Sequence, residues 1–255
     1  DMQILPTLHS KRPSAVFYRG RLVAADGWLL GEMPGHEHPE EKLNTFYLGD
    51  VTDADLRLAA PVDSGEHKAR VILYPSAESN LTRCSIESIP VQGGFADISH
   101  DESLCFVAVL NRHQQHDSRS IGLVRNTGLL RGAVASTVSH DSHNLTVVFR
   151  NVEDAHKAIA AVRNSNGGIA CAENGQVKAN LALPVFGLMS DKPAKELDRE
   201  IEAVKAAMRE LGMNDRRNPL LRTATISLAV APELRITDLG LVDVDKAESV
   251  PVWLD

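Results

Sequence analysis

The sequence predicts an α+β protein, in which a mixed β-sheet carries at least two packed helices and is preceded by a short β-hairpin region. Runs rich in β-branched residues and bounded by Gly or Pro predict the strands. Two stretches with apolar residues three and four positions apart predict the helices. Alternation of apolar and polar residues around Arg19-Gly20-Arg21 near the N-terminus predicts the hairpin region.

The N-terminal stretch SAVFYRGRLVAADGWLL predicts two or three short antiparallel strands, with turns at 19–21 (Arg-Gly-Arg) and 26–27 (Asp-Gly). From residue 31 to about residue 41 the chain is rich in Pro, Gly and charged residues, which is typical of a linker or a surface loop. We therefore expect two domains, residues 1–43 and residues 44–255.

The larger domain contains further segments with the composition of β-strands. Four of them follow one another, at residues 68–76, 84–94, 103–113 and 120–126. Residues 133–138 and 145–149 predict two more extended segments, and residues 167–183 predict a hairpin that turns at Asn174-Gly175. Residues 223–245 predict a closing strand.

The first helix is predicted to begin at about residue 152. Asn151 is a suitable N-cap, and Asp154 lies at the third helical position. One apolar face is formed by Val152, Ala155, Ile159 and Val162. The sequence Asn-Gly-Gly at 166–168 predicts the end of this helix.

The second helix is predicted between Ser190 and Gly212. Ser190 or Asp191 is the expected N-cap, with Pro193 in the first turn. An apolar stripe is formed by Leu197, Ile201, Val204, Met208 and Leu211. Because this stripe lasts less than three heptads, we expect it to pack on a sheet rather than to form a coiled coil.

Charge and composition exclude several classes of protein. The chain has 255 residues and a net charge of -7, and no basic stripe suited to phosphate contacts, which argues against nucleic-acid binding. No apolar run approaches the roughly 20 residues that span a bilayer, and the N-terminus lacks a signal pattern, so we expect a cytoplasmic protein without membrane association. Cys84, Cys105 and Cys171 lie far apart and are expected to be buried free thiols.

The block at 140–144, His-Asp-Ser-His-Asn, is the richest in potential ligands and lies between two predicted strands. A turn could bring His140 and His143 together. Histidine with a carboxylate such as Asp141 can bind a metal or form a general base oriented by its acid partner. The alternative is a polar turn in which Asp141 and Asn144 bond to nearby backbone amides.

Asn111, Arg112 and His113 form a second candidate site at the end of a predicted strand. Arg and Asn in such a position can clamp a planar heteroaromatic group or a carboxylate, and the alternative is a solvated loop entry. His36 and His38 resemble a His-x-His metal pair, but nothing in the Pro-rich linker would hold them rigid. The chain has no GxGxxG after a strand, no P-loop, no HExxH, no GxSxG and no zinc nucleobase deaminase motif.

Four segments resemble bacterial adenine deaminases in the same order along the chain. The most specific is GLLRGAVASTVSHDSHNLTVV, which contains the block Ser-His-Asp-Ser-His-Asn. The others are NRH, NGGIACAENGQVKANLALPVFGLMSD and LAVAPELRITDLGLVDVD. The N-terminal AVFYRGRLVAADGWLL resembles the last hairpin of the small β-domain that accompanies the metal-dependent barrel of amidohydrolases.

The resemblance implies that the chain is the C-terminal part of an adenine deaminase, a hydrolase that converts adenine and water into hypoxanthine and ammonia. In this family a (β/α)₈ barrel holds a manganese or iron centre, and the barrel is missing from this chain. We therefore expect the metal ligands to lie elsewhere. The expected partners are adenine as substrate, a barrel domain or chain, and a second copy in a homo-oligomer.

The same resemblance suggests roles for individual residues. The expected catalytic residues are His140, Asp141 and His143. The expected substrate-binding residues are Ser139, Asn144, Asn111, Arg112 and His113. They would face the barrel mouth, where they would bind the purine, move protons or hold the closed site. Phe149 departs from the family, in which Gly is usual there, and the turn that follows could differ.

Two alternatives to this function follow from the sequence. The first is a non-catalytic purine-binding or regulatory module that reuses the domain. The second is a self-sufficient hydrolase with its own metal on His140, Asp141 and His143. Such a metal site needs a further ligand, for which His113 and His100 are the candidates.

Overall fold

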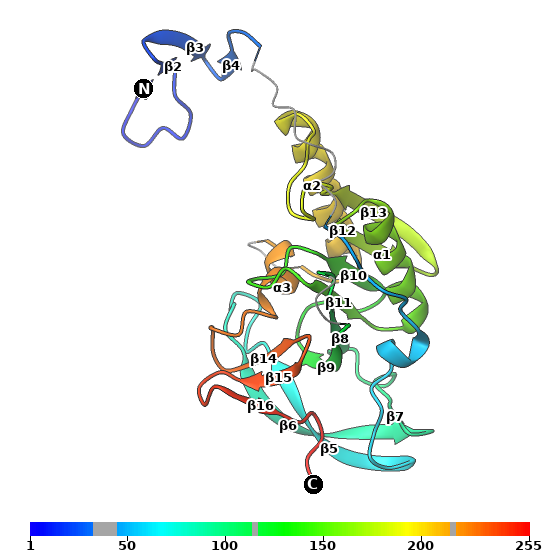
Figure 1. Cartoon of the computed structure of the whole chain (residues 1–255). Coiled ribbons are helices and arrows are strands. Elements are labelled where there is room, and N and C mark those ends of the chain that lie inside the picture. Colours follow the sequence, from blue (N-terminus) through cyan, green and yellow to red (C-terminus); the bar gives the residue numbers. More distant parts are fainter. Residues whose placement is uncertain (33–44, 114–116, 215–217) are drawn as a thin grey trace. The chain divides into compact units, whose positions relative to one another are not determined.

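The computed structural model describes residues 1–32, 45–113, 117–214 and 218–255 (Figure 1). By its internal contacts the chain divides into two compact units, Asp1–Pro39 and Glu40–Asp255.

The N-terminal unit is a four-stranded antiparallel sheet in the order β1-β2-β3-β4. Its strands are β1 (Met2–Ile4), β2 (Ala15–Tyr18), β3 (Arg21–Ala25) and β4 (Trp28–Leu29). Both predicted turns are confirmed, since Arg19 and Asp26 have φ angles of 48° and 51° and each is followed by a glycine with positive φ. Two consecutive positive φ values match the tight turns that join twisted strands. The alternation did not predict β1.

A nine-stranded mixed sheet forms the centre of the larger unit, in the order β13-β12-β10-β11-β8-β9-β5-β6-β7. Among the described residues of this sheet, the β5–β9 pair is parallel and the other strand pairs are antiparallel. The strands are β5 (Ser64–Leu73), β6 (Arg83–Gln92), β7 (Phe95–Ala96), β8 (Leu104–Leu110), β9 (Arg119–Arg125), β10 (Ala133–Ser136), β11 (Leu145–Phe149), β12 (Gly168–Glu173) and β13 (Gln176–Ala182). The predicted α+β class is confirmed.

Helices α1 (Val152–Asn164) and α2 (Ala194–Glu210) pack on opposite faces of this sheet. Along β10, Ala133 and Ala135 belong to the apolar cluster that contains α1, whereas Val134 belongs to the cluster that contains α2. This alternation follows from the two-residue period of a strand. The apolar stripe of α2 packs on the sheet, as predicted.

The two helices differ in how well the sequence predicted their first residues. For α1 the prediction is confirmed, because the Asn151 side chain accepts a hydrogen bond of 2.8 Å from the backbone N–H of Asp154. For α2 the prediction of Ser190 or Asp191 as N-cap is wrong. Pro193 has an extended ψ of 141° and is itself the N-cap. The first residue of the helix is therefore the one after it, Ala194.

The closing strand predicted over residues 223–245 is also wrong. The segment contains the end of α3 (Leu220–Thr225) and two strands of a separate antiparallel sheet, which is formed by β14 (Leu234–Thr237), β15 (Gly240–Asp243) and β16 (Glu248–Val250). The β-branched composition favours a strand, but long-range contacts override it in α3. The Arg222 guanidinium donates to the carbonyl oxygens of Ser76, Ala77 and Ser79 and holds the helix there.

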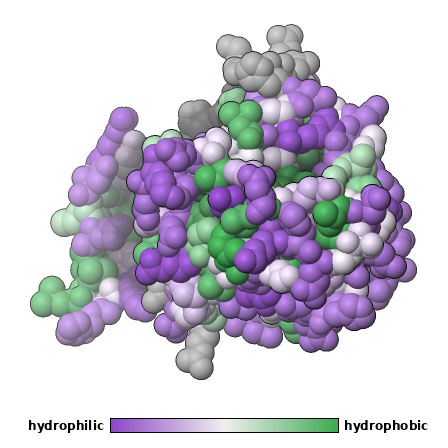
Figure 2. Space-filling view, turned by 90° about the horizontal axis from the view of Figure 1, so that it is seen from below, coloured by the Kyte–Doolittle hydropathy of each residue, from purple (hydrophilic) through white to green (hydrophobic). Residues whose placement is uncertain are grey.

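The three cysteines are free: Cys105 and Cys171 are buried, and Cys84 is half-buried. On the face of the molecule shown in Figure 2, hydrophobic residues lie among predominantly hydrophilic ones. Within the described residues, none of the helices combines the length and the apolar composition needed to cross a membrane.

Candidate functional site

The two polar blocks singled out in the sequence meet at one end of three neighbouring strands. Leu110, the last residue of β8, pairs with Leu145, the first residue of β11, and with Arg119, the first residue of β9. Residues 111–113 therefore leave the sheet next to the point where residues 140–144 enter it. The alternating buried faces of the strands specify this register.

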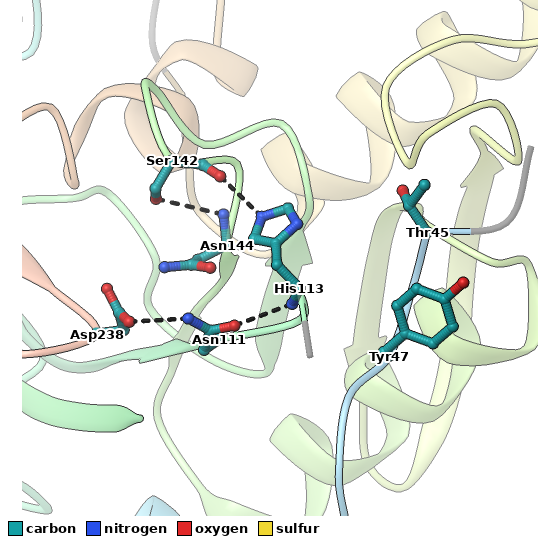
Figure 3. Close-up of a pocket in the computed structure, with 7 residues that line it drawn as sticks. All are labelled: Thr45, Tyr47, Asn111, His113, Ser142, Asn144 and Asp238. Carbon is teal, nitrogen blue, oxygen red and sulfur yellow. Dashed lines mark hydrogen bonds between the residues drawn. The ribbon is translucent and has the colours of Figure 1, made fainter. Parts of the chain in front are cut away.

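A pocket of about 590 Å³ lies where these segments meet (Figure 3). Its lining residues are Thr45, Tyr47, Asn111, His113, Ser142, Asn144 and Asp238. Asn111, His113 and Asn144 were predicted to bind substrate. The other predicted site residues are not part of the lining.

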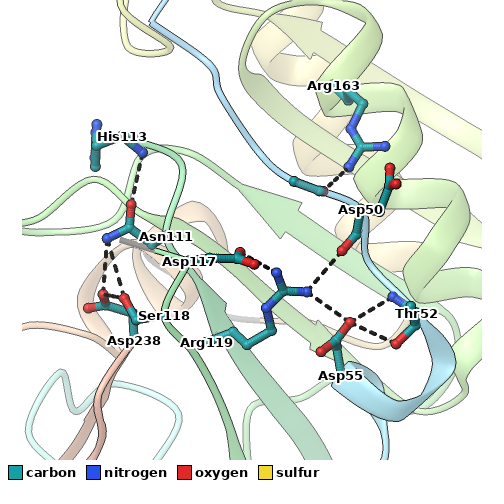
Figure 4. Close-up of polar contacts among 11 residues, drawn as sticks. Asp50, Thr52, Asp55, Asn111, His113, Asp117, Ser118, Arg119, Arg163 and Asp238 are labelled. Carbon is teal, nitrogen blue, oxygen red and sulfur yellow. Dashed lines mark hydrogen bonds and ion pairs between the residues drawn. The ribbon is translucent and has the colours of Figure 1, made fainter. Parts of the chain in front are cut away.

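A chain of hydrogen bonds joins three walls of the pocket (Figures 3 and 4). His113 Nε2 donates to the carbonyl oxygen of Ser142 at 2.8 Å, and the backbone N–H of His113 donates to Asn111 Oδ1 at 2.9 Å. Asn111 Nδ2 in turn donates to Asp238 Oδ2 at 3.1 Å, and Ser118 Oγ donates to the same oxygen at 2.5 Å. Both functional groups of the Asn111 amide are thereby engaged, which fixes its orientation.

The segment that carries Thr45 and Tyr47 is held against the sheet by two arginines (Figure 4). Arg119 Nη1 donates to the carbonyl oxygen of Asp50 and to Asp55 Oδ2, both at 2.9 Å. Arg163 of α1 donates to the carbonyl oxygen of Gly49 at 2.7 Å. These contacts bring a segment remote in sequence to the pocket.

Arg112 lies behind the pocket and is only 1% exposed. Its guanidinium donates to three carbonyl oxygens, those of His143 (2.6 Å), Thr45 (3.2 Å) and Phe186 (3.0 Å). Burial lowers the pKa of the Arg112 guanidinium to about 10, so the side chain stays cationic at neutral pH. The structure thus places Arg112 as a scaffold for three loops, not at the pocket surface where the sequence suggested a ligand clamp.

Ser139 is also buried, with no exposed surface. Its Oγ lies 2.8 Å from Thr146 Oγ1, which lies 3.1 Å from Ser227 Oγ. This chain of hydroxyl groups joins the loop before β11, which carries Ser139, to β11 itself and to the segment after α3. Ser139 therefore satisfies buried polar groups and does not line the pocket.

The loop brings the two imidazoles of the polar block together. The rings of His140 and His143 lie edge to face, with centroids 5.6 Å apart. The backbone N–H of His140 donates to the carbonyl oxygen of Ala224, and that of His143 donates to the carbonyl oxygen of Ser139. His143 has a φ of 51°, in the left-handed region that few residues other than Gly and Asn adopt.

The surroundings of His143 favour its neutral form. Burial lowers the pKa of the imidazole below its ordinary value, and the nearby His140, Arg112 and His113 lower it further, while Asp141 raises it. Asp141 itself is exposed. At neutral pH, His143 is therefore a neutral base.

Two buried polar atoms next to the pocket have no hydrogen-bond partner, namely Asn144 Oδ1 and His143 Nδ1. Asn144 is only 2% exposed and lines the pocket. A buried carbonyl oxygen without a partner lowers stability by about 1–3 kcal/mol. Such unsatisfied atoms in a native protein are often explained by a ligand or a water.

The chain matches a known domain family over residues 79–248, the adenine deaminase C-terminal domain. The chain belongs to this family. The matched region contains the pocket residues from β8 to the turn after β14, together with the whole of the block at 140–144.

Adenine deaminases from several bacteria are similar to this chain. It is 35% identical over 255 residues to adenine deaminase 2 of Carboxydothermus hydrogenoformans, covering all of this chain and 44% of that protein. It is 38% identical over 244 residues to the adenine deaminase of Moorella thermoacetica, covering 95% of this chain and 41% of that protein. The chain thus spans less than half the length of these relatives.

The described part of this adenine deaminase C-terminal domain does not fit a metal. No three or more His, Cys, Asp or Glu side chains among its described residues are placed so that they could hold an ion. His140, Asp141 and His143 therefore do not form such a group with His113 or His100 in the described structure. His36 and His38 lie outside the described residues.

Sequence reasoning gave no role to five residues of the site in this family member: Thr45, Tyr47, Ser118, Ser142 and Asp238. Asp238 lies in the segment LAVAPELRITDLGLVDVD, which resembles the family, so the resemblance pointed to the right region but not to the residue. Thr45 and Tyr47 carry no local signal, because contacts with residues far along the chain bring them to the pocket. Arg112 donates to the carbonyl oxygen of Thr45 and accepts from the backbone N–H of Tyr47, and Arg119 and Arg163 hold the residues that follow.

Proposed function

We propose that this chain is the C-terminal part of an adenine deaminase, and that its pocket closes against the active site of a barrel domain. The reaction would convert adenine and water into hypoxanthine and ammonia. The observation that carries the proposal is the convergence of both polar blocks of the family domain on one pocket. The adenine deaminase names of the relatives favour an enzyme over the purine-binding or regulatory module.

The barrel would supply a manganese or iron ion, which activates water. The residues of this chain would bind the purine and move protons. Asn144 and His113 line the pocket and would contact the substrate, with Asn111 holding the His113 backbone in place. Arg112 and Ser139 would act as positioning residues, since each is buried behind the loop.

His143, His140 and Asp141 would exchange protons with water at the mouth of the site. The neutral imidazole of His143 suits a proton acceptor, and the exposed carboxylate of Asp141 can stabilise the imidazolium that results. Deamination needs such groups, because the departing amine must gain a proton before it leaves as ammonia. A cytoplasmic location and self-association belong to the same proposal.

The test is ammonia release from adenine by the complete gene product that contains this sequence, supplied with Mn²⁺. The 255-residue chain alone is assayed in parallel. We expect activity in the complete product and none in the chain alone. Absence of adenine hydrolysis by the metal-loaded complete product would reject the function. Activity of the chain alone would reject the need for a barrel.

His143→Asn tests the role of the loop, because Asn tolerates a left-handed backbone whereas Ala does not. We expect turnover to fall by about 10² or more, the range for loss of a group that transfers protons, with little change in thermal stability. His100→Asn, in an exposed turn, is the matched control and should keep full activity. Equal losses of turnover and stability in His143→Asn would show that the loop is structural.

A further inference from the structure

Asp238 presents an oriented carboxylate to the pocket. It lies in the turn between β14 and β15, next to Thr237, which pairs with Gly240. Ser118 Oγ and Asn111 Nδ2 both donate to its Oδ2 atom, at 2.5 Å and 3.1 Å (Figure 4). Because both donors engage the same oxygen, the carboxylate is held in one orientation and neither donor engages Oδ1.

Asn144 presents a second acceptor to the same pocket. The residue is only 2% exposed. Its Oδ1 atom is buried and has no hydrogen-bond partner. A buried carbonyl oxygen in this state is stabilised when a ligand donates an N–H or O–H group to it. This observation is independent of Asp238, because Asn144 lies in the loop before β11, whereas Asp238 lies in the turn between β14 and β15.

His113 adds a third acceptor in its neutral form. A carbonyl oxygen can only accept, so His113 Nε2 must carry the hydrogen in its 2.8 Å contact with Ser142. The Nδ1 atom of the neutral ring is then an acceptor. Of the seven lining residues, Asp238 is the acidic one, and its carboxylate accepts hydrogen bonds. The pocket therefore suits a ligand that donates hydrogen bonds from N–H groups.

Adenine has two kinds of N–H donor, the 6-amino group and the N–H of its five-membered ring. The departing amine must gain a proton during deamination, and the acceptor oxygens of Asp238 and Asn144 cannot supply one. The ring N–H keeps its hydrogen throughout the reaction, so it fits these acceptors better. We propose that Asp238 and Asn144 bind the ring N–H of the purine and so select free bases over bases substituted at that nitrogen. This inference rests on the proposed function.

The experiment uses purine and 9-methylpurine, which both lack the 6-amino group and differ only in the ring N–H. Their dissociation constants for the complete gene product are measured by calorimetry. We expect 9-methylpurine to bind at least about tenfold more weakly than purine, the effect of one hydrogen bond to a charged acceptor. In the isosteric variant Asp238→Asn this ratio should fall below about threefold, and Asn144→Ala should lower it in the same direction.

Asp245→Asn is the control, since it makes the same chemical change at an exposed residue of the neighbouring β15–β16 turn and should keep the wild-type ratio. A wild-type ratio below about threefold, or no measurable purine binding, would overturn the inference. A wild-type ratio that persists in Asp238→Asn would also overturn it, because steric exclusion of the methyl group would then explain the selectivity. Ammonia release from adenine is measured separately, so failure of the proposed function is distinguished from failure of this assignment.

Discussion

The Nε2 atom of His113 lies 2.8 Å from the carbonyl oxygen of Ser142, and this contact ties the end of β8 to the loop that enters β11. The preceding residue, Arg112, donates to the next carbonyl of that loop, the one of His143, at 2.6 Å. Two successive side chains thus hold two successive peptide groups. The loop that carries the polar block is therefore shaped by a neighbouring strand and not by its own sequence alone.

Replacing Arg112 should destabilise the larger unit strongly. Arg112→Met leaves three buried carbonyl oxygens without their donor, and each unsatisfied group costs about 1–3 kcal/mol, so we expect the free energy of unfolding to fall by about 3–5 kcal/mol. Arg112→Lys should recover only part of this loss, because one ammonium cannot reproduce the planar fork. Urea denaturation measures the change. Arg199→Met, on the exposed face of α2, is the control, and an equal effect there would contradict the assignment.

Gly187 should not tolerate a side chain. Its φ is +72°, and a Cβ atom there would lie 2.9 Å from three atoms of the buried Arg112 guanidinium. Gly93 has a φ of +60° with nothing within 4 Å of its Cβ position, so Gly93→Ala reports the backbone strain alone. We expect Gly187→Ala to lower the thermal midpoint clearly more than Gly93→Ala does, because it also displaces Arg112. Equal shifts would mean that the guanidinium moves aside freely.

The stability of the larger unit should depend on pH through His143. Its pKa is lowered in the folded state, so the unfolded chain binds more protons as pH falls through the ordinary histidine pKa of 6.5. The contribution of His143 is therefore present above about pH 6.5 and is lost as pH falls toward the lowered folded pKa. Urea midpoints between pH 5 and pH 8 should fall less steeply on acidification in His143→Asn than in the wild type. Parallel curves for the two proteins would contradict this expectation.

Phe149 should be a core residue whose loss is costly. Its side chain is fully buried, and its ring lies 5.5 Å from that of Phe106. Phe149→Ala is expected to lower the free energy of unfolding by about 3–5 kcal/mol, from lost burial and the cavity left behind. Val230→Ala, at a side chain that is 74% exposed, should change it by less than about 0.5 kcal/mol. Urea denaturation of both variants tests the difference.

The sequence predicted a structural feature correctly wherever that feature depends on an interaction between residues close together in the chain. The Asn151 cap acts on a backbone N–H three residues away, and the turn at Asn174-Gly175 needs positive φ angles that these two residues adopt readily. The apolar stripe of α2 likewise predicted which face of that helix packs on the sheet. The polar block at 140–144 was recognised as a loop between two strands for the same reason.

Tertiary structure decided the features that depend on partners far along the chain. Residues 223–225 are helical because α3 is held by the loop after β5, and the β-branched composition that predicted a strand there is outweighed. The sequence could not reveal that Arg112 is buried, since its carbonyl partners come from three separate loops. The sequence also could not show that Asp238 lies within hydrogen-bond distance of Asn111, 127 positions away.

The sequence by itself determined the fold class, the order of most strands and helices, and the residues rich enough in polar groups to form a site. Only the tertiary structure decided which of these residues line the pocket and which lie behind it. The physical reason is that side-chain periodicity is a local property, whereas strand register and buried hydrogen bonds join segments distant in sequence.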